Sequence, residues 1–157
     1  MKIGFGYDSH RFSKGRKLVL GGVEIPWEMG FIAHSDGDVL IHSLIDALLG
    51  ASGQGNIGLR YPDSDEKYKD ISSLKLLEDT FVFLENEYRI VNIDSTIILE
   101  KPKINPFLEQ MKKNISKILN ISNNSINIKG KTSEGMGLVG KGEGAAVFTV
   151  VLLERVS

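Results

Sequence analysis

The chain has 157 residues, of which 41% are hydrophobic and 25% charged, so it is long enough for one buried core and too short for two. Its net charge of -1 argues against duplex nucleic acid as a partner, and the absence of cysteine excludes disulfides and thiolate zinc sites. No apolar run approaches the ~20 residues that span a bilayer, and the N-terminus lacks the apolar segment of a signal peptide. We therefore expect one domain over residues 1–157, located in the cytoplasm, with neither nucleic acid nor a membrane as partner.

The spacing of apolar residues changes along the chain between a period of two and a period of three to four, which predicts mixed strands and helices. The pattern of residues 3–7 predicts a first strand. Residues 17–20 and 23–25 predict a hairpin that ends at Pro26, because the two glycines between them reach the positive φ angles of a tight turn.

A first helix is predicted over residues 35–51, with Ser35 as its cap. Apolar residues fill most of this segment and leave Asp38, His42 and Asp46 as a polar stripe at intervals of four. A solvated helix face would explain such a stripe, although solvated faces more often carry Lys and Glu. The stripe leaves a structural and a functional interpretation open.

The remainder of the chain continues the mixed pattern. Residues 56–69 have little periodicity and predict a mobile loop. Beyond it, the pattern predicts a helix over residues 72–88, a strand over 90–99, a helix over 105–120 capped by Asn105, and a strand over 126–129.

All three histidines lie in the N-terminal part of the chain, each with an aspartate close by. In an extended segment Asp8 and His10 point to the same side, and a helix makes a similar pair of His42 and Asp46. Two imidazoles and one carboxylate from such a cluster suit a zinc-like divalent ion with an open fourth position. Taken singly, however, each residue is more often a turn residue, a surface histidine or a hydrogen-bonded core histidine.

Residues 129–144 form a glycine-rich segment between two predicted strands. Glycines let backbone N–H groups close on a ligand, and Thr132, Ser133 and the nearby lysines add donors suited to phosphate. The order of residues is not that of a Walker loop, so nucleoside triphosphate hydrolysis is not predicted. Glu134 would suit a magnesium ligand beside a bound diphosphate, and a long flexible hairpin is the alternative.

Several short motifs occur together in a specific order. They are GYDSH (6–10), HSDGDV (34–39) with His42, DALLG (46–50), IG (57–58), YPDSD (61–65), TII (96–98), PK (102–103), KTSE (131–134) and GKGEG (140–144). In their order and spacing they make the chain resemble, over essentially its whole length, the 2-C-methyl-D-erythritol 2,4-cyclodiphosphate synthase family of the non-mevalonate isoprenoid pathway.

The resemblance implies a phosphorus-oxygen lyase. In the family's reaction the 2-phosphate of 4-diphosphocytidyl-2-C-methyl-D-erythritol 2-phosphate attacks the outer phosphorus of its own diphosphate and expels CMP. Because nucleophile and electrophile belong to one molecule, the enzyme's task is to align them and to neutralise charge. No protein nucleophile is required.

The resemblance also implies roles for individual residues. Asp8, His10 and His42 resemble the ligands of Zn²⁺ or another divalent transition metal, and Glu134 resembles the ligand of Mg²⁺ or Mn²⁺. His34 and Thr132 resemble the residues that stabilise the transition state. The implied substrate-binding residues are Ser35, Asn56, Ile57, Gly58, Tyr61, Pro62, Asp63, Ser64, Asp65 and Ser133 around the phosphates and the erythritol, Lys103, Ile104, Asn105, Gly130 and Lys131 around the cytidine, and Leu138 and Lys141 in the glycine-rich segment. We further expect Asp38 and Asp46 to orient metal ligands.

The family fold is a compact single-domain α/β sandwich, a mixed sheet with helices packed on one face. It assembles as a homotrimer with active sites between subunits, and we expect both features here. Three positions depart from the family pattern: Asn56 replaces an aspartate, Leu138 an aromatic residue and Lys141 an arginine. Lysine contacts a phosphate as a point charge without the arginine fork, which weakens the case for an isoprenoid diphosphate on the trimer axis beside Glu143.

Two other functions remain open from the residues alone. A zinc-dependent phosphate-ester hydrolase could use the same three ligands with a bound water as nucleophile. A non-catalytic isoprenoid diphosphate binding protein would need no metal.

Overall fold

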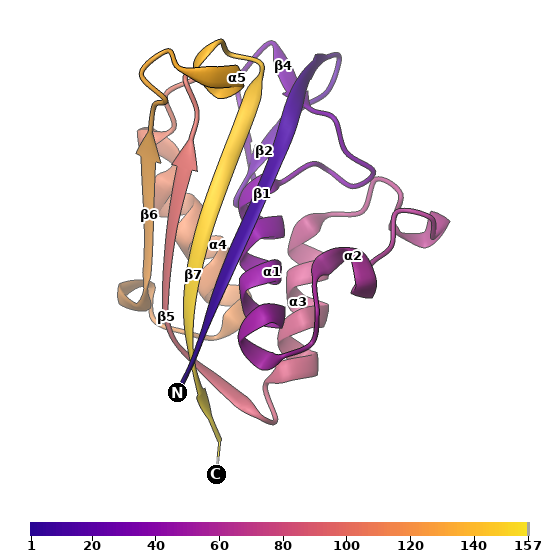
Figure 1. Cartoon of the computed structure of the whole chain (residues 1–157), viewed down its shortest axis with the longest axis vertical. Helices are drawn as coiled ribbons and strands as arrows, with labels where there is room; N and C mark the ends of the chain where they lie inside the picture. Colours follow the sequence, from indigo (N-terminus) through magenta and orange to yellow (C-terminus); the bar gives the residue numbers. More distant parts are fainter. Residues whose placement is uncertain (157) are drawn as a thin grey trace.

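The computed structural model describes residues 1–156, and its centre is a five-stranded sheet (Figure 1). The sheet has the order β4-β1-β7-β5-β6, formed by β1 (Lys2–Lys14), β4 (Met29–Phe31), β5 (Tyr88–Ile98), β6 (Ile126–Lys131) and β7 (Gly144–Arg155). β5 and β6 pair in parallel, whereas the other neighbours pair antiparallel. A separate hairpin consists of β2 (Leu18–Leu20) and β3 (Val23–Ile25). The sheet is therefore mixed, as predicted.

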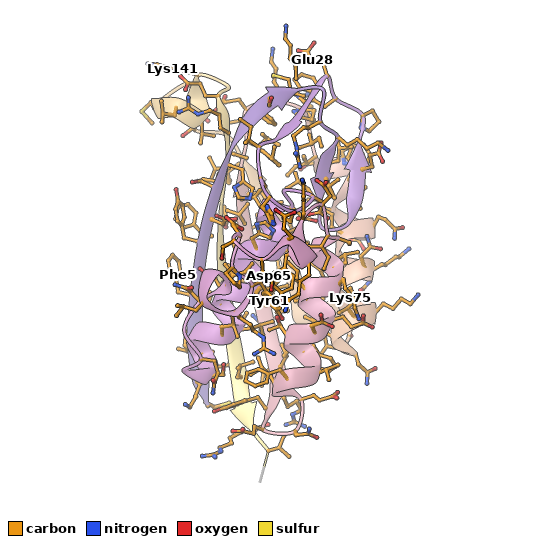
Figure 2. The ribbon with its side chains drawn as sticks, turned by 90° about the vertical axis from the view of Figure 1, so that its right-hand side faces the viewer. Phe5, Glu28, Tyr61, Asp65, Lys75 and Lys141 are labelled. Carbon is orange, nitrogen blue, oxygen red and sulfur yellow. The ribbon has the colours of Figure 1, made fainter. Side chains whose placement is uncertain are left out.

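The helices lie on one face of this sheet, except for the short helix of residues 137–140, which lies over the other face (Figures 1 and 2). They are α1 (Val39–Ser52), α2 (Ile57–Arg60), α3 (Ser73–Leu84), α4 (Leu108–Leu119) and α5 (Gly137–Gly140), with single 3₁₀ turns at Glu66–Tyr68, Asn105–Phe107 and Asn123–Ser125. Among the described residues, no helix is both long enough and apolar enough to cross a bilayer. The architecture confirms the α/β sandwich, with the long helices α1, α3 and α4 packed on one face.

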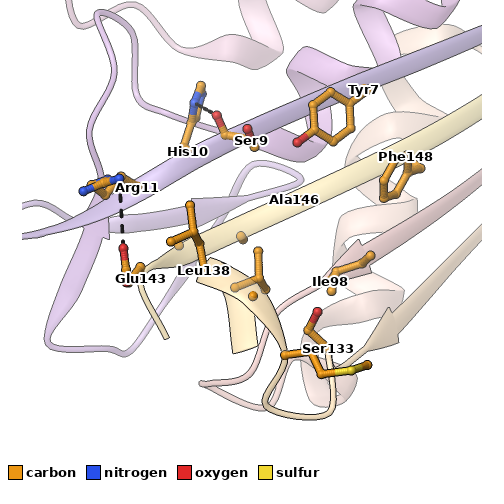
Figure 3. Close-up of a pocket in the computed structure, with 15 residues that line it drawn as sticks. Tyr7, Ser9, His10, Arg11, Ile98, Ser133, Leu138, Glu143, Ala146 and Phe148 are labelled. Atoms are coloured by element: carbon orange, nitrogen blue, oxygen red, sulfur yellow. Dashed lines mark hydrogen bonds and ion pairs between the residues drawn. The ribbon is translucent and has the colours of Figure 1, made fainter. Parts of the chain in front are cut away.

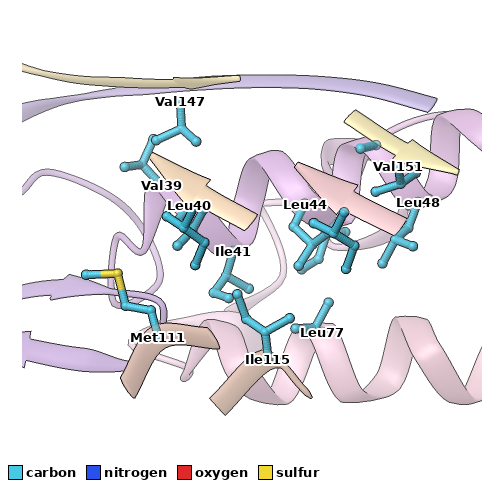
Figure 4. Close-up of a cluster of buried hydrophobic side chains, with 14 of the residues drawn as sticks. Val39, Leu40, Ile41, Leu44, Leu48, Leu77, Met111, Ile115, Val147 and Val151 are labelled. Atoms are coloured by element: carbon cyan, nitrogen blue, oxygen red, sulfur yellow. The ribbon is translucent and has the colours of Figure 1, made fainter. Parts of the chain in front are cut away.

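The core lies between α1 and the sheet (Figure 4). Leu40, Leu44 and Leu48 of α1 are fully buried, and Val147 and Val151 of β7 are also buried. Leu77 of α3 and Ile115 of α4 extend the same apolar cluster on the other side of α1. Burial of each such side chain contributes about 1.5–3 kcal/mol, so this layer fixes the position of α1 against the strands.

The opposite face of the sheet carries exposed apolar side chains. Phe5, Tyr7 and Phe148 are 61%, 49% and 37% exposed, and Figure 2 shows Phe5 pointing away from the helices. Tyr7 and Phe148 pack together with ring centroids 5.0 Å apart. Successive residues of a strand point to opposite faces, so β1 and β7 present an apolar surface on the side opposite the long helices.

Two element boundaries near the site differ from the prediction. β1 continues to Lys14, so Asp8 and His10 lie inside the strand and not at its end. α1 begins at Val39 with Asp38 as its cap, and Ser35 caps nothing. Asp38 takes this role because its carboxylate also accepts the backbone N–H groups of the β2–β3 turn, a contact between distant segments.

Other predicted boundaries were also wrong in detail. The second long helix ends at Leu84, and Tyr88 begins β5 instead of closing the helix. Asn105 makes no capping hydrogen bond and lies inside a 3₁₀ turn that precedes α4. The predicted loop 56–69 contains α2 and a 3₁₀ turn, and β4 was not anticipated. β4 has only three residues and pairs only with β1, so its existence depends on a partner strand.

Candidate active site

Two glycines of β1 bring α1 into direct contact with the strand. A Cβ on Gly4 would lie 1.9 Å from the carbonyl oxygen of Ala47, and one on Gly6 would lie 1.9 Å from that of Ser43. Only hydrogen fits at either position. Asp8 and His10 continue the same face of β1, because residues two apart in a strand share a face.

The close approach of α1 places His42 beside Asp8 and His10. Asp8 Oδ2 lies 3.1 Å from His42 Nδ1 and 3.3 Å from His10 Nε2, and the two ring nitrogens lie 3.0 Å apart. Tetrahedral zinc with bonds of ~2.0–2.1 Å separates its ligand atoms by roughly 3.3–3.4 Å. The spacing and the borderline character of the three donors therefore fit a divalent transition metal, and we call Asp8, His10 and His42 the ligand triad.

The surroundings of the two imidazoles affect their pKa values in opposite directions. Burial lowers the pKa of His10, an effect that the charge of Asp8 opposes and that of His42 reinforces. Burial also lowers the pKa of His42, but the hydrogen bond and the charge of Asp8, followed by the charges of Asp38 and Asp36, raise it above its ordinary value. A carboxylate between two imidazoles is thus the main charge partner of both rings.

The second nitrogen of the His42 ring faces two serines. Nε2 lies 3.0 Å from Oγ of Ser35 and 2.9 Å from Oγ of Ser73. Ser73 in turn donates to Asp36, with 2.5 Å between Oγ and Oδ1. Sequence analysis did not identify Ser73 or Asp36, because no local spacing relates a residue of α3 to a histidine 31 positions earlier.

Asp38 and Asp46 do not orient the ligand triad, contrary to our expectation. Asp38 is fully buried and accepts N–H groups from Gly21, Gly22 and Ile41. Asp46 accepts the N–H of Ile57 and so anchors the start of α2. Both carboxylates are used by the backbone of neighbouring segments, and the predicted pair of His42 and Asp46 does not form.

The ligand triad lies in a cavity of about 360 Å³, which we call the metal cavity. Besides the triad, the predicted site residues that line it are His34, Ser35, Ile57, Gly58, Tyr61 and Asp63. Ile32, Ala33, Tyr68 and Leu76 complete the lining, and sequence analysis did not identify them. The structure thus brings together residues that the sequence placed in four separate motifs.

The segment from Asn56 to Asp65 forms one wall of the metal cavity. Asn56 caps α2 by accepting the N–H of Leu59, and the Tyr61 hydroxyl hydrogen-bonds to Thr80 of α3 at 2.8 Å. The carbonyl of Asp65 lies 3.4 Å from Nε2 of His34. Pro62, Ser64 and Asp65 belong to this wall but do not line the cavity itself.

A second group of predicted residues gathers at the far edge of the sheet. Lys103, Ile104, Asn105, Gly130, Lys131 and Thr132 line a cavity of about 230 Å³ beside the end of β6, which we call the edge cavity. A Cβ on Gly130 would lie 3.2 Å from Ile104, so the glycine keeps the cavity floor open. β7 and β5 separate β6 from β1, which puts roughly 14 Å of sheet between the two cavities.

The glycine-rich segment adjoins the edge cavity. Thr132 donates its hydroxyl to Glu134, and Ser133 donates its N–H to the carboxylate of Glu100 at 2.6 Å. Glu134 is exposed and is not part of the ligand triad. The turn therefore presents a hydroxyl and a carboxylate side by side, a polar pair suited to a hydrated cation and a phosphate.

The remaining predicted residues line two further cavities. Ser133 and Leu138 line one of about 570 Å³ on the open face of the sheet, together with Tyr7, Glu143 and Phe148 (Figure 3). Lys141 lines a separate one of about 330 Å³ with Phe12 and Trp27. His10 also lines the first of these cavities, so Ser133 and Leu138 share a cavity with one member of the ligand triad, whereas Lys141 does not.

The chain is similar to known proteins over almost its whole length. The YgbB family model matches residues 1–154. A curated 2-C-methyl-D-erythritol 2,4-cyclodiphosphate synthase from Caldicellulosiruptor bescii is 54% identical over 153 residues, which cover 97% of this chain and 98% of that protein.

Solved structures match equally well. The bifunctional IspDF of Campylobacter jejuni gives a TM-score of 0.95 at 41% identity, over 99% of this chain and 42% of that one. The CDP complex of IspF from Plasmodium falciparum gives a TM-score of 0.86 at 35% identity, over 99% of this chain and 97% of that one. The chain therefore belongs to the YgbB family, the family of 2-C-methyl-D-erythritol 2,4-cyclodiphosphate synthases.

Proposed function

We propose that this chain converts 4-diphosphocytidyl-2-C-methyl-D-erythritol 2-phosphate to the 2,4-cyclodiphosphate and CMP by intramolecular phosphoryl transfer. By its family it is an enzyme of the isoprenoid pathway, a cyclodiphosphate synthase. The observation that carries the detailed proposal is the metal cavity, where the ligand triad opens onto His34, Ser35 and the wall formed by α2.

The ligand triad would hold Zn²⁺ or another divalent transition metal. When bound, such an ion supplies Lewis-acid polarisation of the attacked phosphate. His34 and the Ser35 hydroxyl line the same cavity and can donate hydrogen bonds to phosphate oxygens. Ile57, Gly58 and residues 61–65 would enclose the erythritol, which excludes water and keeps the two phosphates aligned.

The edge cavity would hold the cytidine. The CDP complex of the Plasmodium falciparum relative supports a cytidine diphosphate ligand for this fold. Lys103, Asn105 and Lys131 provide charged and amide groups around the floor formed by Gly130 and Ile104. Thr132 and Glu134 would then contact the diphosphate and the Mg²⁺ or Mn²⁺ that accompanies it.

We also propose that the chain works as a homotrimer with active sites between subunits. Two features support this assembly. The metal cavity and the edge cavity lie at different edges of one sheet, so a neighbouring subunit can supply the cytidine end of a site. The face of the sheet opposite the long helices carries exposed apolar side chains, as expected of a surface that is covered on association.

The direct test is to incubate the purified protein with the cytidyl substrate, Zn²⁺ and Mg²⁺. We expect release of CMP and formation of a cyclic diphosphate, both of which phosphorus NMR can detect. Absence of CMP would refute the proposed reaction. Oxygen-18 water distinguishes the alternative hydrolase, because hydrolysis places solvent oxygen in the product and cyclisation does not.

A further inference from the structure

We infer that Ser73 and Asp36 are positioning residues that hold the His42 ring ready for a metal. The inference rests on the proposed metal site and adds to it the groups that fix one of its ligands. Nδ1 of His42 faces Asp8 at 3.1 Å, and Nε2, on the other side of the ring, faces Oγ of Ser73 at 2.9 Å. The ring is therefore held at both nitrogens.

The hydrogen bonds of Ser73 determine which nitrogen carries the proton. Its Oγ lies 2.5 Å from Oδ1 of Asp36, a carboxylate that can only accept, so the single hydroxyl proton points toward Asp36. The lone pairs of Oγ are then left for His42, whose Nε2 must donate. When the ring is neutral, its one proton is therefore on Nε2, and Nδ1 keeps a free lone pair on the side of Asp8 and His10, as a metal ligand requires.

Asp36 is itself held firmly. Its Oδ2 accepts the N–H of Ser73 at 2.9 Å, and its Oδ1 accepts the N–H of Asp38 at 3.1 Å. Ser72, at the cap position of α3, makes no capping hydrogen bond, so Asp36 replaces the missing cap from another segment. One carboxylate thus joins the start of α3 to the start of α1, and His42 lies between them.

The same network leaves Ser35 free for another task. Ser35 Oγ also lies 3.0 Å from Nε2 of His42, but that nitrogen has one proton, and Ser73 is committed to accept it. Ser35 lines the metal cavity and Ser73 does not. The hydroxyl proton of Ser35 can therefore point into the cavity toward a phosphate oxygen, while Ser73 has a purely supporting role.

The first test replaces Ser73 and measures metal affinity without substrate. Ser73→Ala should weaken Zn²⁺ binding by roughly 10–100-fold in competition with a chromophoric chelator, the usual effect of losing a group that orients a ligand. Ser43→Ala is the matched control, because Ser43 is an equally buried serine of α1 whose hydroxyl bonds to Leu40 and Thr149, away from the triad. Its affinity should equal that of the wild type.

A second measurement needs no variant. Nitrogen-15 NMR of the metal-free wild type, at a pH well above the histidine pKa values, should show His42 with its proton on Nε2. A proton on Nδ1 would overturn the inference, and so would a Ser73→Ala protein that folds and binds Zn²⁺ as tightly as the wild type. In Ser73→Ala we expect a mixture of His42 rings, some with the proton on Nε2 and some with the proton on Nδ1.

The outcome can be separated from that of the proposed reaction. If the wild type binds Zn²⁺ in a manner that depends on Ser73 but releases no CMP, the reaction is refuted and the support for His42 stands. If the wild type binds no Zn²⁺, the ligand triad and its support are both refuted. If Ser73→Ala does not fold, two other measurements test the inference. They are the Zn²⁺ affinity of Asp36→Asn and the His42 tautomer of the wild type.

Discussion

At the residue scale, the site depends on how a few buried polar groups share their protons. His42 is only 8% exposed, yet both of its nitrogens have partners, Asp8 on one side and two serines on the other. Among the described residues, the ring of His34 has one hydrogen-bond contact, at 3.4 Å to the carbonyl of Asp65, and it faces the metal cavity. We therefore propose different tasks for the two histidines, with His42 holding a metal and His34 contacting substrate.

This division predicts different results for two alanine variants. His42→Ala should remain folded and lose bound metal, because a triad reduced to two ligands holds a divalent ion weakly. His34→Ala is the control and should keep its metal while CMP release falls by roughly 10²–10⁴-fold, as for loss of a group that acts in the transition state. Metal analysis of the purified proteins decides. A fully loaded His42→Ala protein would show that the ligand assignment is wrong.

Asp38 allows a prediction about pH. Burial and the charge of Asp36 raise its pKa from 3.8 to about 7, against the opposing effect of the backbone N–H groups of Gly22, Ile41 and Gly21. The folded state therefore binds this proton more tightly than the unfolded state. The resulting stabilisation is complete below pH 3.8 and is lost as the pH rises through about 7.

The measurement compares the unfolding free energy of the wild type with that of Asp38→Asn, whose side chain does not titrate. The advantage of the wild type should shrink as the pH rises from 4 to 7. Carbon-13 NMR of the Asp38 carboxyl group should show a midpoint near 7. A constant free-energy difference across this range would contradict the prediction.

At the scale of elements, the contact between β1 and α1 builds the ligand triad. Gly4 and Gly6 face the backbone of α1 on the same side of β1 as Asp8 and His10. The helix can approach only because neither glycine has a side chain. Without this approach His42 would lie too far from Asp8 to share a metal with it.

Two glycine substitutions test this contact. Gly6→Ala should cost about 3 kcal/mol or more, because the new Cβ meets the carbonyl oxygen of Ser43 at 1.9 Å and backbone cannot move aside cheaply. Gly50→Ala is the control, since its Cβ would meet nothing nearer than 3.9 Å and alanine favours a helix by about 0.5–1 kcal/mol. Denaturant unfolding measures both. Equal stability of Gly6→Ala and the wild type would refute the close contact.

At the scale of the whole molecule, one sheet serves two surfaces. Its helix-covered face carries the core and the ligand triad, whereas its other face exposes Phe5, Tyr7 and Phe148 (Figures 2 and 3). The cytidine residues that we propose lie at the β6 edge, away from β1. If both groups belong to one site, as we propose, a second copy of the chain has to supply one of them.

The assembly prediction concerns the exposed apolar face. Phe5→Glu should turn the proposed trimer into monomers and reduce CMP release at least 10-fold by a rough estimate, because a charge placed in an apolar interface is costly to desolvate. Val82→Glu, at a 56% exposed position on α3, is the control and should leave both unchanged. Sedimentation at one protein concentration measures the oligomeric state. A trimeric Phe5→Glu protein would exclude this face as the interface.

The sequence by itself determined the mixed fold class, the approximate positions of the three long helices, the family and the three residues of the ligand triad. It did so because strand alternation puts Asp8 and His10 on one face and because the motifs are short and local. The start of α1 was not predictable in this way. Asp38 caps the helix because it also binds the β2–β3 turn, a contact that no local pattern contains.

Only the tertiary structure decided how the parts meet. It brought His42 of α1 to β1 through two glycines, and it placed Ser73 of α3 behind the His42 ring. The roles predicted for Asp38 and Asp46 were wrong because they too depend on contacts between distant segments. A carboxylate at helical spacing can bind a ligand or a neighbouring backbone, and long-range packing decides which N–H groups reach it first.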